Sequence, residues 1–319
     1  VKAADTTEWI NARQADDPDK PWFAYLAFNL SHATSAFQNS MVVPDQDTLD
    51  CHPTDSDLDG PACREIKQCG GTFGSTSRGS CNGEQLMRVM TTSMDTVIGK
   101  VLETVASIPS DTYVIYIGDN GTPMYSNLGD LGSQIGNMYI TRTGRGKGTA
   151  YESGARVAMA IKGPGISPNG NSSEFVHAAD LFSTILELAG LTPPEEVPNS
   201  DGQSTPLDSI SLVPILDGSA SSIRYPDTGY ILTEAQNLMV TGQPMVVGAR
   251  NAAYKVICKD GTSTSDCEFY HLENDPLEEH KLDAYETSSC SSVVTGTPEW
   301  HYCHLVDVIN KYSILKNPS

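Results

Sequence analysis

The sequence has no apolar run long enough to cross a bilayer and few basic residues, and from its first residues we expect no signal peptide. A membrane-spanning helix needs about 20 consecutive apolar residues, so we expect no membrane span. The chain has 20 basic against 40 acidic residues, which gives a formal net charge of -20 and an isoelectric point near 4.5. Because such a chain repels phosphate backbones and anionic lipids, nucleic acid and anionic membranes are not expected as partners. The absence of basic clusters also argues against long polyanionic glycans as substrates.

An initiator methionine is absent as well, and residues 1–14 have the pattern of an amphipathic helix. We therefore expect the chain to begin inside a longer product. Of its 319 residues, 39% are hydrophobic and 19% are charged, which is typical of a globular protein. This length suffices for one large α/β domain with a small appendage, or for two ordinary domains.

The eight cysteines fall into two groups of four. The first group comprises Cys51, Cys63, Cys69 and Cys81. Its spacing is C-x11-C-x5-C-x11-C, with His52 as the only nearby imidazole. A zinc site is one interpretation, but without a CxxC pair the spacing favours a disulfide-pinned insertion over 39–83. The second group, which we expect to form another disulfide-stapled patch, comprises Cys258, Cys267, Cys290 and Cys303.

Disulfides and glycosylation sites indicate the same compartment. Asn29-Leu-Ser and Asn171-Ser-Ser are acceptor sequons for N-glycosylation. Disulfides persist in oxidising environments. We therefore expect a glycoprotein that is secreted or otherwise extracytoplasmic, whether extracellular, lysosomal or periplasmic.

Hydrophobic patterns predict alternating strands and helices. Residues 22–28 and 113–117 are continuous apolar runs, which are typical of strands buried on both faces of a parallel sheet. A helical period of three and four residues begins at Leu86 and ends before Pro109. We expect an α/β fold with a mostly parallel central sheet sandwiched by helices. Further expected elements are a strand over 156–161, a helix over 178–190, strands over 245–249 and 253–258, and a helix near 304–313.

The pattern changes beyond roughly residue 225, where the expected strands become short and are separated by turns. We therefore assign residues 1–224 to the large α/β domain, which contains the insertion over 39–83. Residues 225–319 are assigned to a small C-terminal subdomain with an antiparallel sheet and a helix.

Three groups of residues could carry chemistry. Asp119 and Asn120 follow the strand predicted over 113–117, and their oxygens suit a hard cation such as calcium or magnesium, although Asp-Asn-Gly is also a common turn. Asn120-Gly-Thr is formally a sequon too. Lys147 lies between glycines, where its ammonium group could meet an anion or belong to a solvated loop. His32 follows the first predicted strand, where a histidine is more often structural than catalytic.

The order of these groups resembles the sulfatase family of the alkaline-phosphatase superfamily. Ser31-His32 stands where the family has Pro-His, and residues 112–121 resemble its strand ending in Ser-Asp-Asn-Gly. Residues 147–158 resemble the signature Lys-Gly-x-x-x-Glu-Gly-Gly-x-Arg-Val-Pro, with departures at Ser153 and Ala158. Other similar segments are Met94-Asp95, residues 177–190, Tyr254-Lys255 and residues 269–276.

The resemblance implies roles for single residues. Asp119 and Asn120 match two of the family's calcium ligands, with Mg²⁺ as an alternative ion. Lys147 and His32 match residues that bind sulfate oxygens, and the lysine also helps to neutralise the leaving group. Fixed cations at that point stabilise the transition state of sulfate-ester hydrolysis. The implied substrate is a small-molecule or saccharide sulfate ester. Residues interpreted as structural are Glu152, Arg156 and Asp180.

The family's nucleophile, a formylglycine made within a Cys/Ser-x-Pro-x-Arg motif, has no counterpart in this sequence. Two N-terminal metal-binding aspartates of the family have none either. We therefore expect the missing N-terminal part of the same polypeptide to complete the site. Two alternatives stay open: a phosphodiesterase or phosphonate-type hydrolase on the same fold, and a non-catalytic sulfatase-like protein. Two-metal relatives tend to have Asp-His-Gly where this chain has Asp119-Asn120-Gly121, which favours the sulfatase.

Overall fold

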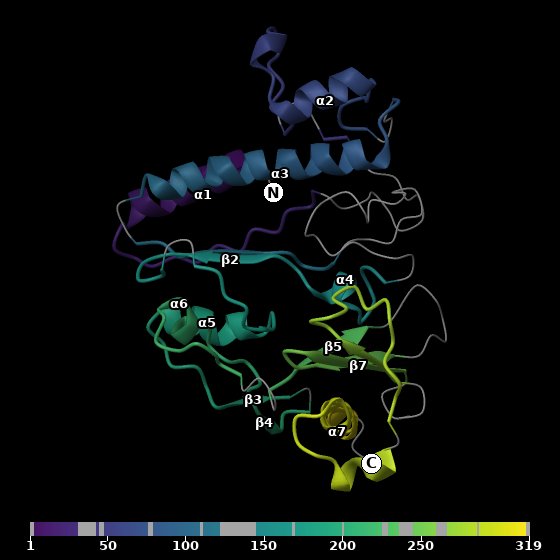
Figure 1. The fold of residues 1–319 in the computed structure, drawn as a ribbon. Coiled ribbons are helices and arrows are strands. Elements are labelled where there is room, and N and C mark those ends of the chain that lie inside the picture. Colours follow the sequence, from purple (N-terminus) through teal and green to yellow (C-terminus); the bar gives the residue numbers. More distant parts are fainter. Residues whose placement is uncertain are drawn as a thin grey trace. The chain divides into compact units, whose positions relative to one another are not determined.

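The computed structural model describes residues 3–30, 43–44, 48–75, 79–108, 111–121, 145–167, 170–199, 201–224, 229–235, 245–259, 267–285 and 287–316. The described residues up to Thr112 form one compact unit, and those from Tyr113 onward form a second (Figure 1). Within these ranges no helix has both the length and the apolar character to span a bilayer.

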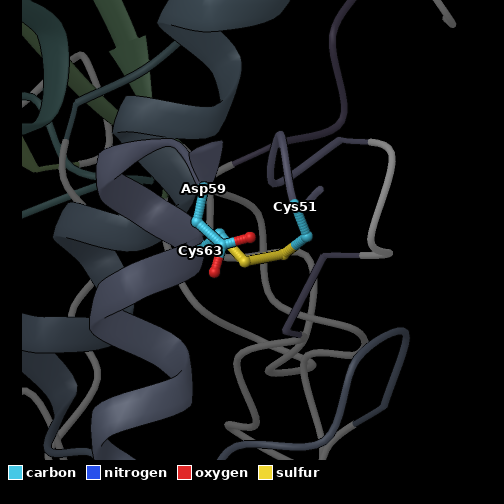
Figure 2. A group of neighbouring side chains, drawn as sticks. All are labelled: Cys51, Asp59 and Cys63. Carbon is cyan, nitrogen blue, oxygen red and sulfur yellow. A yellow bond between two sulfur atoms is a disulfide. The ribbon is translucent and has the colours of Figure 1, made fainter. Parts of the chain in front are cut away.

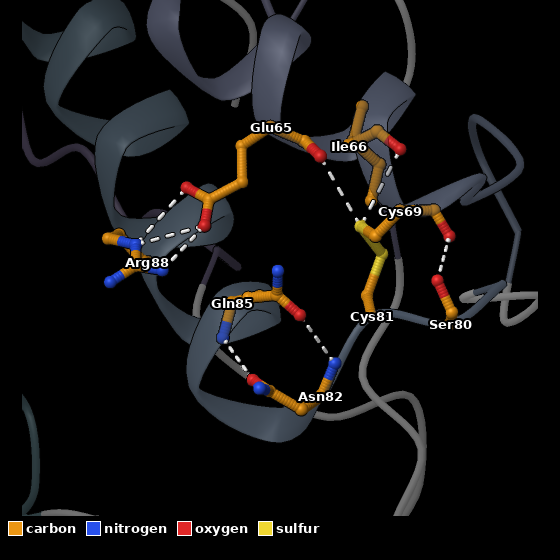
Figure 3. The surroundings of a disulfide bond; sticks show 8 residues. All are labelled: Glu65, Ile66, Cys69, Ser80, Cys81, Asn82, Gln85 and Arg88. Carbon is orange, nitrogen blue, oxygen red and sulfur yellow. Dashed lines mark hydrogen bonds and ion pairs between the residues drawn. A yellow bond between two sulfur atoms is a disulfide. The ribbon is translucent and has the colours of Figure 1, made fainter.

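The first unit is built around a long helix, α3 (Gly83–Ala106), which contacts α1 (Ala3–Asp16) and α2 (Pro61–Cys69). A capping box begins α3, as Figure 3 shows. The Asn82 side chain accepts from the Gln85 amide at 2.9 Å, and the Gln85 side chain accepts from the Asn82 amide at 2.9 Å. These bonds satisfy amide groups that the first turn of a helix leaves without partners. The helices predicted at residues 1–14 and from Leu86 are both confirmed.

Two disulfides hold the cysteine-rich insertion of the first unit, as the sequence predicted. They join Cys51 to Cys63 and Cys69 to Cys81. Helix α2 carries one cysteine of each bridge, Cys63 and Cys69. It is followed by Gly70, whose φ of +70° is the left-handed conformation that glycine adopts most readily. Its Glu65 forms an ion pair with Arg88 of α3 at 2.6 Å (Figure 3). The buried core between these helices includes Val43, Leu49, Ile66, Leu86 and Met90.

Residues 22–28 are not part of a paired strand in the structure, so this prediction is wrong. Alternate side chains along the segment are exposed, including Phe23 at 66% and Tyr25 at 82%. The segment lies against α1, where the rings of Trp22 and Trp9 meet edge to face with centroids 5.9 Å apart. A strand buried on both faces needs neighbouring strands, and none of the described strands pairs with this segment.

The second unit begins with β1 (Val114–Ile117), which pairs with β2 (Met159–Lys162). The pair is antiparallel, as is every other strand pair among the described residues, so the parallel central sheet is not confirmed. Between β1 and β2 the described residues contain only the four-residue helix α4 (Glu152–Ala155). The predicted helix over 178–190 is α5 (Asp180–Leu188). The remaining elements here are β3 (Glu196–Pro198), β4 (Ser204–Pro206) and α6 (Val213–Leu216).

An antiparallel sheet in the order β5-β6-β7-β8 completes the second unit. Figure 1 labels its strands β5 and β7. Its strands are β5 (Ile231–Ala235), β6 (Val246–Arg250), β7 (Tyr254–Lys259) and β8 (Cys267–His271). Helix α7 (Pro298–Lys316) packs against β6 and β7 and encloses a core that includes Val256, Phe269, Tyr302 and Leu305. Disulfides join Cys258 to Cys267 and Cys290 to Cys303. The small antiparallel sheet with a helix is confirmed, and the domain boundary at residue 224 stays a prediction.

Candidate active site

The end of β1 is tied to the segment that precedes β2. The Gly118 amide donates to the Ala158 carbonyl at 3.0 Å, and the Gly121 amide donates to the Gly154 carbonyl at 3.0 Å. The residues between these two bonds are Asp119 and Asn120. The predicted cation ligands are therefore held beside α4 and the loop that leads into it.

Two glycines permit this close approach. A Cβ atom on Gly121 would lie 1.9 Å from the Ser153 carbonyl oxygen. A Cβ atom on Gly154 would lie 2.4 Å from the Gly146 oxygen and 2.5 Å from the Thr149 oxygen. Real Cβ atoms do not come so near to backbone oxygens, so the two segments can meet only where both residues lack a side chain.

Asp119 and Asn120 present oxygen donors at an exposed strand end. Both residues are exposed, and Oδ1 of Asp119 accepts a hydrogen bond from the Asn120 amide at 2.8 Å. This bond holds one oxygen of the carboxylate against the adjacent backbone. A carboxylate and an amide oxygen form a donor set that a hard cation such as Ca²⁺ or Mg²⁺ accepts.

Lys147 occupies the corner of a tight turn over 146–149. The Thr149 amide donates to the Gly146 carbonyl at 3.1 Å, and the Thr149 hydroxyl donates to the same oxygen at 2.7 Å. Gly148, the third residue of the turn, has a φ of +84°, which favours glycine at this position. The turn thus projects Lys147, which is half-buried, from a constrained backbone.

Aromatic and polar contacts anchor this turn to the sheet β5-β6-β7-β8. The Arg145 guanidinium lies over the Tyr151 ring, 4.6 Å from its centroid. The Tyr151 hydroxyl donates to Glu268 of β8 at 2.6 Å, and that of Tyr270 donates to the same carboxylate oxygen at 2.7 Å. Burial and the adjacent Glu268 carboxylate raise the pKa of Tyr151 to about 12. Burial opposes ionisation of Glu268, but Lys281 and the two tyrosines outweigh it and hold the Glu268 pKa below its usual value.

A buried ion-pair cluster lies where the chain enters α4, on the C-terminal side of the turn over 146–149. It comprises Glu152, Arg250, Lys255 and Glu278. Lys255 Nζ lies 2.9 Å from Glu152 Oε1 and 3.1 Å from Glu278 Oε1. Arg250 lies 2.6 Å from the second oxygen of Glu152. Burial opposes ionisation of Glu152, yet Lys255 and Arg250 outweigh it and lower the pKa of Glu152. Burial raises the pKa of Glu278, and Lys255 offsets this only in part.

The sequence predicted none of the roles of Arg250, Lys255 or Glu278. One signal was available in the run Tyr254-Lys-Val-Ile-Cys258, where a lysine interrupts an apolar strand. A lysine at such a position needs an acidic partner if it is buried. The partners come from residues 152 and 278, which are too distant in sequence for any local pattern to reveal.

His32 lies outside the described residues, so its predicted role as a sulfate ligand stays a prediction. Another histidine, His177, precedes helix α5, and Asp180 of the helix accepts from its amide at 2.7 Å. Asp180 is fully buried, and it also accepts from the Ile210 amide at 3.0 Å and from Arg224 at 2.7 Å. These bonds support the structural interpretation of Asp180.

Cys51, Asp59 and Cys63 lie close enough together to suggest a metal site. Figure 2 shows, however, that the two sulfur atoms are joined in a disulfide. The Asp59 carboxylate is also used, because it accepts from the His52 amide at 2.9 Å and from Lys67 at 2.7 Å. With its thiols oxidised and its carboxylate paired, this group offers no metal site, which settles the zinc alternative for this cysteine pair.

Comparison with known proteins identifies the family of this chain. The family described as Sulfatase matches residues 3–191, which is more than half of the chain. Arylsulfatase K from Canis lupus familiaris is 22% identical over 298 residues, covering 85% of this chain and 49% of that protein. The chain therefore belongs to the sulfatase family of the alkaline-phosphatase superfamily. It spans about half the length of this curated relative.

Solved structures show the same fold. A 2-O GAG sulfatase is similar with a TM-score of 0.50 and 17% identity, over 97% of this chain and 57% of that chain. A phosphonate monoester hydrolase from Silicibacter pomeroyi is similar with a TM-score of 0.55 and 18% identity, over 99% of this chain and 61% of that one. At these identities the likeness establishes a sulfatase-like fold without distinguishing the two activities.

Proposed function

We propose that this chain supplies part of the active site of a calcium-dependent sulfuric ester hydrolase. The observation that supports the proposal best is the hydrogen bond from the Gly121 amide to the Gly154 carbonyl. It ties the loop bearing Asp119 and Asn120 to the loop that bears Lys147. This hydrogen bond therefore joins the loop that offers oxygen donors for a cation to the loop whose ammonium group could meet an anion.

Asp119 and Asn120 would hold the cation, with Ca²⁺ as the expected ion and Mg²⁺ as the alternative. Their neighbouring carboxylate and amide oxygens fit the preference of these ions for hard donors. A bound cation would polarise the sulfuryl group and favour an ionised nucleophile. Two donor residues are fewer than such an ion needs, so the proposal requires further ligands from elsewhere in the protein.

Lys147 would contact the sulfate oxygens and the leaving oxygen of the ester. Negative charge grows on the leaving oxygen as the ester bond breaks, so an ammonium group fixed at that point stabilises the transition state more than the bound substrate. The turn over 146–149 supports this role because it holds the lysine at its corner. His32 would add a second contact to the sulfate group.

A further part of the same polypeptide would complete the site with the nucleophile, expected as formylglycine, and with more metal ligands. Residues 22–28 support this part of the proposal. Phe23 and Tyr25 line an open apolar groove together with Asp5, Thr6 and Trp9 of α1. An added strand would cover these side chains.

The proposed substrate is a small-molecule or saccharide sulfate ester that the enzyme meets outside the cytoplasm. Four disulfides among the described residues support an oxidising compartment. Because acidic residues are in excess, the protein as a whole repels an anionic substrate. A bound cation and Lys147 would make the site locally positive.

The test compares an aryl sulfate with an aryl phosphonate monoester as substrates of the complete natural protein. We expect preference for the sulfate ester and a loss of kcat of about 100-fold in Lys147→Met. Lys162→Met, which alters an exposed lysine at the end of β2, is the matched control and should retain full activity. Preference for the phosphonate would favour the phosphonate-type alternative. Turnover of neither ester would favour the non-catalytic alternative.

A further inference from the structure

The buried ion-pair cluster connects the Lys147 loop with the C-terminal sheet. Lys255 lies on β7 and is 1% exposed, and Glu278, from the loop after β8, is also 1% exposed. Glu152 follows the Lys147 turn by a few residues and begins α4. Three chain segments that are far apart in sequence therefore meet at one lysine ammonium group.

The cluster holds the backbone of the loop as well as its side chains. One oxygen of Glu278 accepts a hydrogen bond from the Glu152 amide at 2.7 Å, while the other faces Lys255. The φ of +55° at Glu278 is unusual for a residue with a side chain and shows how tightly this loop is constrained. Two carboxylates and two cations balance in charge, so the cluster is stable only as a complete set.

Apolar packing strengthens the same connection. Ala150 is buried against Ile257, Tyr270 and Leu272 of the sheet region. A Cβ atom on Gly248 of β6 would lie 3.4 Å from the Ala150 Cβ and 3.7 Å from Cε of Lys255. These are ordinary van der Waals distances, so β6 passes close to both the loop and the lysine stem.

The opposite end of the Lys147 turn is fixed to the same sheet region. Arg145 lies over the rings of Tyr151 and Tyr270 and donates to the Leu277 carbonyl at 3.4 Å. Leu277 precedes Glu278 in sequence, so both ends of the turn reach one short stretch of chain. Lys147 thus lies in a loop that contacts the C-terminal sheet region on both sides of the turn.

We propose that Lys255 and Glu278 are positioning residues that act through Glu152 to fix Lys147 for the sulfate group. One step of this inference rests on the proposed function, namely that Lys147 contacts the sulfate group of the substrate. The C-terminal sheet would then be part of the active-site scaffold, although it contributes no group that touches the substrate.

Hydrogen exchange of the complete natural protein tests the positioning without any substrate. In Lys255→Met, which keeps the length of the side chain and removes its charge, we expect the amides of residues 146–154 to exchange at least about tenfold faster. Lys259→Met is the matched control, because this lysine lies on the same strand and is exposed, and it should leave those rates unchanged. The amides of α7 report whether each variant is folded.

A variant that keeps α7 protected and leaves exchange of residues 146–154 unchanged overturns the proposal. If Lys255→Met fails to fold, Glu278→Gln decides by the same criterion. This substitution retains an oxygen that can accept from the Glu152 amide and removes the charge that faces Lys255, and we expect exchange about threefold faster.

Kinetics separate positioning of Lys147 from a general loss of structure. Glu278→Gln should lower kcat by about tenfold in the natural protein but by less than about twofold in a Lys147→Met background, because the two changes act through one group. Equal losses in both backgrounds would contradict a role through Lys147. If the natural protein hydrolyses no sulfate ester, the proposed function fails, whereas the exchange rates still decide whether the cluster fixes the loop.

Discussion

Arg224 and Asp180 form a buried ion pair in which a guanidinium nitrogen lies 2.7 Å from a carboxylate oxygen, with the two side chains 6% and 0% exposed. The same carboxylate accepts from the His177 and Ile210 amides. One side chain at the start of α5 therefore joins the residue before the helix to two later segments of the chain, at Ile210 and Arg224.

We predict that Asp180→Asn lowers the free energy of unfolding by about 3–5 kcal/mol, because it leaves the buried arginine without its charged partner. Urea unfolding followed by circular dichroism measures the change. Glu187→Gln, on an exposed position of the same helix, should change the stability by less than about 0.5 kcal/mol. A loss for Asp180→Asn no larger than that of the control would show that the pair is not stabilising.

Gly121→Ala should destabilise the protein by at least about 2–3 kcal/mol, because the added methyl group overlaps the Ser153 carbonyl and must push the two loops apart. Gly99→Ala provides a contrast, since Gly99 lies within α3 and a Cβ there meets nothing within 4 Å. It should stabilise the protein by about 0.5–1 kcal/mol through helix propensity. Thermal unfolding of both variants checks the opposite signs, and a neutral Gly121→Ala would contradict the observed packing.

Asp119→Ala should lower the affinity of the complete protein for calcium by about 100-fold or more, because it removes a charged oxygen ligand. Isothermal titration calorimetry with CaCl₂ measures this affinity directly. Asp111→Ala serves as the control, because Asp111 is exposed and precedes β1 by a short distance. Calcium binding that is unchanged in Asp119→Ala refutes the assignment of this residue as a ligand.

Tyr151 predicts a pH dependence of stability at high pH. Burial and Glu268 raise its pKa to about 12 in the folded protein, against the ordinary value of 10.0. The unfolded chain therefore loses this proton first, and the stabilisation is fully present below pH 10 and is lost as the pH rises through about 12. Between about pH 9 and about pH 11, the difference in unfolding free energy between the natural protein and Tyr151→Phe should shrink by about 1 kcal/mol.

Urea titrations at the two pH values check this prediction. Tyr116→Phe is the comparison variant, because it removes the hydroxyl of a tyrosine that is 41% exposed. A stability difference for Tyr151→Phe that stays constant with pH would mean that Tyr151 titrates alike in the folded and unfolded states.

The sequence predicted those elements whose signals are local. The apolar period of α3 predicted a helix from Leu86 that ends before Pro109, whereas the capping box at Asn82, which starts the helix at Gly83, was not predicted. Disulfides were expected from the spacing, but four cysteines can pair in three ways, and only the fold brings Cys51 to Cys63.

Features that depend on distant partners were not predictable. The run over 22–28 has the composition of a buried strand, yet composition does not supply the neighbouring strands that such a segment needs. Asp119 and Lys147 could be named as candidates, but the contact between Gly121 and Gly154 that links their loops appears only in the structure. The buried cluster at Lys255 was missed for the same reason.

The antiparallel sheet limits how this protein can be divided or recombined. Lys255 and Glu278 belong to the C-terminal part of the chain, while Glu152 lies in the middle. In a chimaera whose junction with a relative lies between residues 152 and 255, Glu152 and Lys255 would come from different proteins. The charges at these positions would then have to match. The same holds for a truncated protein that ends before β6, in which Glu152 would lose both of its cationic partners.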